Sequence, residues 1–171
     1  MKKILIVLAL ALSFSCQQES KVGFVDNGEL INGYQMKIDI EAKYEGINQS
    51  FTKRMDSLSQ EFQKEVMQFQ SKQQSMSQKE LEEIYQMLGQ KQQQLQQQYQ
   101  VEQQELEKAF QTEIDTVISQ VKDFVKQYGK DNKYKYILGS NEAGSVIYGE
   151  ESSNITKVIL EALNTKYESK K

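Results

Sequence analysis

The side chains that most enzymes use for catalysis are sparse in this sequence. Histidine does not occur among the 171 residues, which excludes histidine general bases, Ser-His-Asp triads and most zinc sites. The acidic pairs Glu82-Glu83 and Glu150-Glu151 have no companion base around them, and a solvated face explains them better. We also find no glycine-rich phosphate loop and no EF-hand calcium loop. The sequence therefore predicts a protein that is not an enzyme and uses no cofactor or metal.

The single cysteine, Cys16, follows a segment typical of an export signal. Lys2 and Lys3 precede nine apolar residues, from Ile4 to Leu12, and this run is too short to span the roughly 30 Å hydrocarbon core of a bilayer. We therefore interpret residues 1–15 as a signal peptide. Without a second cysteine, an intrachain disulfide is excluded.

Two processing routes fit the residues before Cys16. Ser13 and Ser15 satisfy the small-residue rule of ordinary signal peptidase, which would cleave after Ser15. Leu12 and Ser15 also resemble a relaxed bacterial lipobox, in which Cys16 is lipidated and becomes the new N-terminus. The lipobox leucine usually stands one residue closer to the cysteine than Leu12 does. In this second route, residues 16–20 would tether the protein to a membrane.

The charge balance argues against a nucleic-acid partner. The formal net charge is −3, and without residues 1–15 the chain keeps 19 basic and 24 acidic residues. Domains that bind nucleic acids carry a basic patch or stripe instead.

The segment from Ile40 to Tyr128 contains no proline and carries apolar residues at helical spacing. From Ile47 the apolar positions advance in steps of 4, 4, 3, 4, 4 and 3, an eleven-residue repeat that favours straight or slightly right-handed winding. Ser77-Gln78-Lys79-Glu80 matches a capping box that starts a second helix. We predict a long antiparallel helical hairpin over residues 41–109, with its tip near residues 71–77.

The glycines and glutamines of the long helical segment and its end need separate interpretation, and some of them leave two alternatives open. Gly129 is expected to be the C-cap of the second helix. Gly46 and Gly89 each cost about 1 kcal/mol relative to alanine inside a helix, and they fit either bending points or sites of close helix packing. Ten of the fifteen residues from 90 to 104 are glutamine, which fits either a polar lining or a solvated helix face.

Residues 21–40 and 110–171 predict a small body that contains strands. A strand is expected over 21–26 with helical structure from Glu29 or Tyr34, and residues 134–138 and 145–149 predict a β-hairpin. Ser153 or Asn154 is the expected N-cap of a terminal amphipathic helix. The predicted fold class is therefore α+β, a small strand-built oligomerisation body with a long helical arm.

A sheet of this size is marginally stable alone, so we expect the body to complete its core by contact with other copies. The side chains expected at that contact are apolar and come from the strands and the terminal helix: Val22, Phe24, Tyr136, Leu138, Ile155, Val158, Ile159 and Leu163.

The order of these elements resembles the Skp (OmpH-like) periplasmic chaperone family. The most specific similarity is the ending Asn154-Ile155-Thr156 followed by Leu163-Asn164, which is similar to the family's D-I-T version. The resemblance implies a jellyfish-shaped homotrimer in the periplasm, in which strands and terminal helix build the body and three arms enclose a cavity. It also implies an ATP-independent holdase that shields unfolded outer-membrane proteins.

The chain departs from the best-known members in two ways. Their arms are strongly basic, whereas this arm has more acidic than basic residues, so a lipopolysaccharide-binding cluster is not carried over. Those members are also soluble, whereas Cys16 suggests a membrane tether. A structural or adaptor coiled-coil lipoprotein of the envelope is the alternative function.

Four methionines fall on the predicted arm: Met55, Met67, Met76 and Met87. Methionine surfaces can re-pack around varied partners, which makes these residues candidates for contact with client proteins. The alternative is that they fill gaps between the two helices of the arm.

Overall fold

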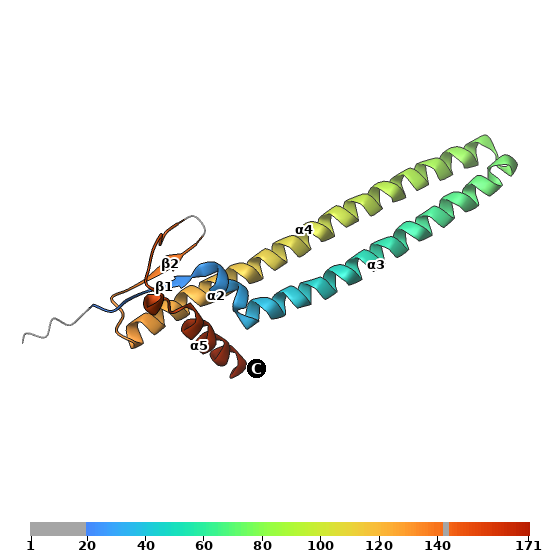
Figure 1. Cartoon of the computed structure of the whole chain (residues 1–171). Helices are drawn as coiled ribbons and strands as arrows, with labels where there is room; N and C mark the ends of the chain where they lie inside the picture. The colour runs from blue at the N-terminus through green and yellow to red at the C-terminus, as the bar shows by residue number, and fades with distance from the viewer. Residues whose placement is uncertain (1–19, 142–143) are drawn as a thin grey trace, which may run out of the picture.

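Two long helices form an arm that projects from a small body (Figure 1). The computed structural model describes residues 20–141 and 144–171. The elements in chain order are β1 (Val22–Asp26), α2 (Asn27–Gly33), α3 (Gln35–Lys72), the 3₁₀ helix η1 (Gln73–Ser75), α4 (Gln78–Asp131), β2 (Tyr136–Ser140), the 3₁₀ helix η2 (Glu151–Ser153) and α5 (Thr156–Glu168). The outer parts of α3 and α4 make the arm, and the remaining elements gather around their inner ends.

The arm turns back where the sequence contains its capping box. Helix α3 ends at Lys72, η1 follows, and Ser77 caps α4. The Ser77 hydroxyl accepts a hydrogen bond from the Glu80 backbone N–H at 3.4 Å, and the Glu80 carboxylate accepts one from the Ser77 N–H at 2.8 Å. This reciprocal pair satisfies two backbone donors at the start of α4, so the predicted capping box is confirmed.

The strands pair differently from the prediction. β1 and β2 form a two-stranded parallel sheet in which Val22 lies opposite Tyr136 and Phe24 opposite Leu138. The predicted hairpin of residues 134–138 with 145–149 is wrong, because the described residues 144–149 form no strand. The second strand instead enters beside the start of β1, where the Lys135 N–H donates to the Lys21 carbonyl at 2.7 Å. Parallel strands need a long crossover, and here the whole arm provides it.

Helix α4 continues past the predicted stop. It ends at Asp131 with Asn132 as C-cap, and Lys133 adopts the left-handed conformation at φ 58°. Gly129 is buried inside the last turn, and a Cβ atom there would lie 3.1 Å from Ile137 Cδ1. The glycine therefore permits close approach of β2 to the helix and does not cap it.

Two polar side chains of α5 hold the N-terminal elements through their backbones. Thr156, which is fully buried, accepts a hydrogen bond from the Asp26 N–H at 2.8 Å. Asn164 accepts from the Gln35 N–H at 2.9 Å and donates to the Gly33 carbonyl at 3.1 Å. These bonds satisfy backbone groups where β1 passes into α2 and where α2 passes into α3.

The ends of the two shorter helices also differ slightly from the prediction. Helix α2 begins at Asn27, and its N-cap Asp26 accepts from the Glu29 N–H at 2.8 Å. Helix α5 begins at Thr156, after the predicted caps, and Asn154 Oδ1 accepts from the Thr156 N–H at 3.1 Å. The N-cap is Ile155, so the predicted N-cap, Ser153 or Asn154, is placed one or two residues too early.

The core of the chain lies where α5 covers β1, α2 and the inner ends of α3 and α4. Its buried side chains come from every one of these elements: Val25, Leu30, Tyr34, Ile40, Tyr44, Val117, Val121, Ile155, Ile159 and Leu163. Outside this cluster, the described part of the arm buries only Phe51, Phe69 and Leu88. Tight packing is thus concentrated in the body.

A carboxylate at position 159 should unfold the body. Ile159 is completely enclosed by its own chain, so Ile159→Asp would bury an unpaired charged or polar group and lower the free energy of unfolding by about 3 kcal/mol or more. Urea denaturation followed by circular dichroism measures this change. Lys157→Asp, at an exposed position in the first turn of α5, is the matched control and should change stability by less than about 0.5 kcal/mol. Equal effects of both substitutions would contradict the assigned core.

Candidate functional site

Aromatic side chains form a seam between the two helices of the arm. Three pairs join α3 to α4: Tyr44 with Phe110, Phe51 with Tyr99, and Phe69 with Tyr85, at ring-centroid distances of 5.2, 5.3 and 4.9 Å. Aromatic pairs contribute about 0.5–1.5 kcal/mol beyond their buried area. In each of the two outer pairs only the phenylalanine of α3 is buried, since Tyr99 and Tyr85 of α4 remain exposed. The seam therefore joins the helices and leaves apolar ring surface open to partners.

Ion pairs accompany the seam at three levels of the arm. They join Lys43 to Glu113 at 2.6 Å, Arg54 to Glu102, and Lys91 to Glu65 at 2.5 Å. Their side chains are largely exposed, so solvent screening leaves them little net stabilising effect. As the arm is followed inward toward the body, the paired residues come earlier in α3 and later in α4.

One of these pairs forms a small network near the body. Glu113 accepts hydrogen bonds from Lys43 and from the Tyr44 hydroxyl at 2.9 Å. The Lys43 hydrogen bond is the main cause that holds the pKa of Glu113 below its usual value, and burial raises the pKa of Tyr44. Glu113 therefore stays ionised and fixes the Tyr44 ring against Phe110.

Open grooves run along the arm beside this seam. One of about 670 Å³ lies on the inner half of α3, and one of about 380 Å³ lies further out between the two helices. The outer groove is lined by apolar and amide side chains from both helices: Met55, Leu58, Ser59, Phe62, Gln63, Gln92, Leu95, Gln96 and Tyr99. The glutamine-rich stretch thus contributes amide groups to this groove and also supplies much of the solvated face of α4.

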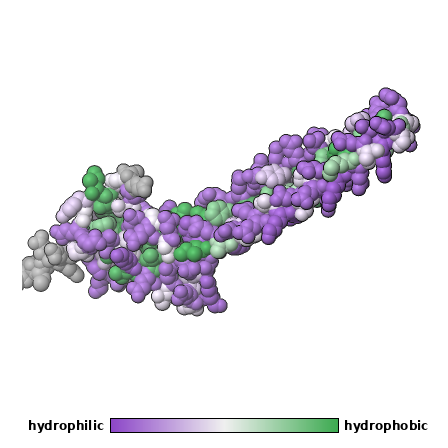
Figure 2. Space-filling view, turned by 45° about the vertical axis from the view of Figure 1, so that its right-hand side comes forward, coloured by the Kyte–Doolittle hydropathy of each residue, from purple (hydrophilic) through white to green (hydrophobic). Residues whose placement is uncertain are grey.

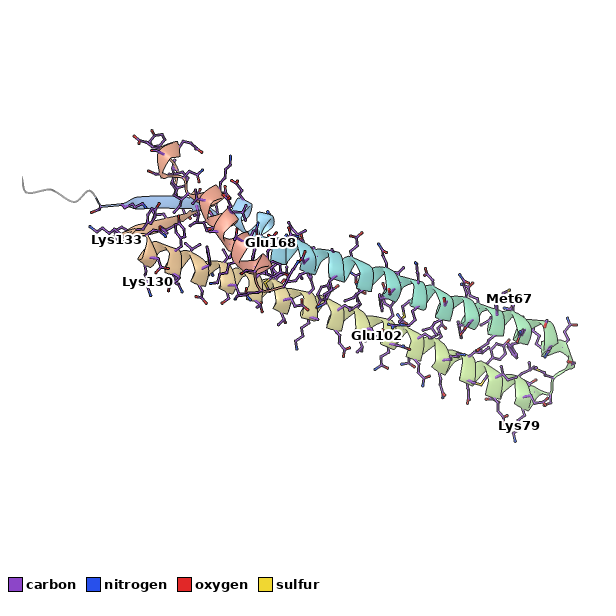
Figure 3. All side chains as sticks on the ribbon, turned by 90° about the horizontal axis from the view of Figure 1, so that it is seen from below. Met67, Lys79, Glu102, Lys130, Lys133 and Glu168 are labelled. Carbon is purple, nitrogen blue, oxygen red and sulfur yellow. The ribbon has the colours of Figure 1, made fainter. Side chains whose placement is uncertain are left out.

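The structure divides the four arm methionines into two kinds. Met67 and Met87 are exposed, and Met67 projects from α3 in the outer half of the arm (Figure 3). Met55 is half-buried in the outer groove, and Met76 is half-buried at the tip. Met55 and Met76 therefore fill gaps in the arm with part of their surface. Met67 and Met87 leave their thioether groups exposed for contact with a partner.

The predicted strand residues of the body share one face of the sheet. Side chains alternate along a strand, and Val22 and Phe24 lie opposite Tyr136 and Leu138. Val22, Tyr136 and Leu138 are exposed, while Phe24 is partly covered by the chain at Gly149. About half of the surface of Val22, Tyr136 and Leu138 on this apolar sheet face stays exposed in the described part of the chain.

The predicted residues of the terminal helix separate into core and surface. Ile155, Ile159 and Leu163 are buried in the core of their own chain, because their face of α5 packs on β1 and the long helices. Their interpretation as contacts between copies is therefore replaced by a role inside one chain. Val158, beside this face of α5, is exposed and stays available.

The sequence reasoning missed two exposed side chains. Ile147 and Tyr148, in the predicted second strand of the hairpin, are 95% and 84% exposed. The space-filling view shows hydrophobic surface on the body and a mostly hydrophilic surface along the arm (Figure 2). The β-branched residues of this segment led to the prediction of a strand. The same residues could have indicated an exposed edge that is available to a partner.

Cys16 lies outside the described residues. Within residues 20–141 and 144–171, no cluster of three or more His, Cys, Asp or Glu side chains could hold a metal ion. No helix of that part is long and apolar enough to cross a membrane.

Removing the two mid-helix glycines should stiffen the arm. A Cβ atom at Gly46 or Gly89 would meet no other atom within 4 Å, so the close-packing alternative has no support within one chain. We expect Gly46→Ala and Gly89→Ala to stabilise their helices by about 0.5–1 kcal/mol each and to slow amide exchange between residues 62 and 98. Hydrogen exchange measured by mass spectrometry tests this. Faster exchange in either variant would contradict it and indicate close packing between copies.

Comparisons with known proteins place the chain in a family. The family model described as outer membrane protein (OmpH-like) matches residues 21–163. A crystal structure from Caulobacter crescentus CB15, described as a candidate outer membrane chaperone (OmpH-like), superposes with a TM-score of 0.77 at 18% sequence identity and covers 86% of this chain and 85% of that one. No curated protein sequence matches the chain. The family model spans β1, the arm and most of α5, and the chain belongs to the OmpH-like family.

Proposed function

We propose that this chain is an ATP-independent holdase chaperone of the periplasm that binds unfolded outer-membrane proteins and prevents their aggregation. The observation that carries the proposal is the arm of an OmpH-like family member, which exposes apolar side chains beside open grooves instead of closing into a packed coiled coil. The solved relative described as a candidate outer membrane chaperone has the same fold.

The physical properties of the arm suit transient binding of unfolded chains. Beyond the core, the helices extend on the order of 45 Å at ~1.5 Å per residue. Exposed methionine and tyrosine side chains adapt to varied apolar segments, and the surrounding glutamines supply hydrogen-bond donors and acceptors. Binding of this kind uses no catalytic residue and no nucleotide.

Self-association would turn single arms into an enclosure. The sheet has only two strands, and its exposed apolar face adjoins the exposed Ile147 and Tyr148. Two-stranded sheets are marginal alone, and exposed strand edges pair readily. We therefore propose a homotrimer in which bodies join through this face and three arms surround the client.

Attachment to a membrane is the second part of the proposal. Lipidation of Cys16 would hold the body at a bilayer through residues 16–20, and two or more acyl chains are needed for stable anchoring. Cleavage after Ser15 would instead leave the protein soluble in the periplasm.

Shortening the arm should abolish protection of clients. Deleting residues 58–68 and 86–96 removes about three turns from each helix and keeps the tip with its Phe69–Tyr85 pair. We expect this variant to lose the ability to suppress light scattering when a urea-unfolded β-barrel protein is diluted. The intact chain, and the full-length variant Gly89→Ala as control, should both suppress it.

The alternative function predicts a different result. A structural or adaptor coiled-coil lipoprotein would leave the aggregation of the β-barrel protein unchanged even with its arm intact. In that case the holdase proposal fails, and the arm acts as a spacer within the envelope.

The exposed sheet face should control assembly. Leu138 is 47% exposed on this face, and Leu138→Lys would place a charge where another body packs. We expect the dissociation constant of the oligomer to rise at least about tenfold in sedimentation experiments. Val101→Lys is the matched control, because Val101 is 46% exposed on the arm, and it should leave the oligomer intact. A wild-type chain that stays monomeric at micromolar concentration would contradict the proposed trimer.

A further inference from the structure

Five lysines gather at the end of the body that lies opposite the arm tip: Lys21, Lys126, Lys130, Lys133 and Lys135. We refer to this group as the lysine end. Lys130 and Lys133 mark it in Figure 3, at the far end from Lys79 near the tip. All five side chains belong to exposed residues. None of them contributes to the arm grooves or to the core described above.

The fold creates this cluster from segments far apart in sequence. Because β1 and β2 run parallel, both strands start at the same end of the sheet, and the Lys135 N–H donates to the Lys21 carbonyl at 2.7 Å. The Lys21 ammonium lies 4.0 Å from the centroid of the Tyr134 ring. The left-handed Lys133 donates its backbone N–H to the Lys130 carbonyl at 3.2 Å, which turns the chain from α4 into β2.

Little negative charge offsets these lysines. Asp123 lies 3.5 Å from Lys126, but both side chains are more than two-thirds exposed, and Asp131 accepts a hydrogen bond from Gln127 at 2.8 Å. Within the described residues, the other four lysines take part in no ion pair. The chain as a whole is acidic, so this positive end is a local departure from its surface.

Apolar side chains border the positive charge. Tyr136 and Val22, the first residues of the two strands, are exposed directly beside Lys135 and Lys21, at the outer end of the sheet face and beyond the Leu138 position through which copies are proposed to join. Lysines next to exposed tyrosine suit the boundary of a bilayer, where the ammonium groups meet headgroups and the ring enters the interface. An acidic soluble protein or a free phosphate would use the charge and leave this apolar border unoccupied.

The position of the lysine end in the chain favours the same partner. Lys21 is five residues after Cys16, so a fully extended connection spans at most about 18 Å. We propose that the lysine end docks on the anionic surface of a phospholipid bilayer, with the arm projecting away from the membrane. Lipidation of Cys16 would add to this contact but is not required for it, and client binding by the arm is a separate property.

Vesicle co-sedimentation of the full chain tests the docking. The probes are vesicles of phosphatidylcholine alone and of phosphatidylcholine mixed with phosphatidylglycerol, at low and physiological salt. Each lysine near an anionic surface strengthens partitioning about fivefold, so the triple variant Lys130→Gln, Lys133→Gln, Lys135→Gln should bind the anionic vesicles on the order of 100-fold more weakly. Binding of the wild type should fall as salt rises.

The arm provides a control with the same change in charge. Lys64→Gln, Lys72→Gln, Lys79→Gln should bind the anionic vesicles as the wild type does, because these lysines lie on the outer arm. All variants share residues 1–19, including Lys2 and Lys3, so any contribution of this segment cancels when the variants are compared on the same vesicles. Circular dichroism confirms that each variant is folded, and suppression of aggregation in solution should be unchanged in the lysine-end variant.

Three results would overturn the proposal. Equal loss in both triple variants would mean that only overall charge matters. Wild-type binding that is the same for neutral and anionic vesicles would exclude an anionic surface as partner. Competition by inorganic phosphate at constant ionic strength would indicate a phosphate or acidic-protein site instead of a bilayer.

Discussion

Two side chains of helix α5 form hydrogen bonds with the backbone at the two junctions of the N-terminal segment, and these bonds hold the body together. Thr156 binds where β1 becomes α2, and Asn164 binds where α2 becomes α3. Between these two side chains, Ile159 and Leu163 press into the core that α3 and α4 share. Buried backbone groups without partners are costly, so these few bonds set the entry angle of α3 and hence the direction of the arm.

The arm depends on this closure because it has little packing of its own. Its seam consists of aromatic pairs spaced along two helices, with exposed ion pairs that contribute little. Local stability follows the density of buried contacts, so opening fluctuations should be concentrated toward the tip. A thin arm on a firmly packed base keeps apolar surface accessible without exposing the core, and this arrangement suits the proposed binding of unfolded chains.

Two regions of the body surface suit two different kinds of contact. The sheet face around Leu138 is apolar and fits contact between copies, whereas the lysine end, bordered by Tyr136, is positive and fits a negatively charged surface. The two features adjoin because a parallel pair places the strand starts, which follow Lys21 and Lys135, together at one end. A hairpin of neighbouring strands would have put Lys21 and Lys135 at unrelated places.

Local signals predicted the elements whose physics is local. The capping box at Ser77, the length of the arm helices and the first strand followed from residues a few positions apart. The type of strand pairing, the role of Gly129 and the burial of Ile159 could not be predicted in this way. Each depends on which distant segment arrives next to it, as Thr156 meets Asp26 across 130 residues of chain. Sequence periodicity by itself determined that α5 has an apolar face, and only the tertiary structure decided that this face covers its own core, because burial depends on the neighbours that the folded chain supplies.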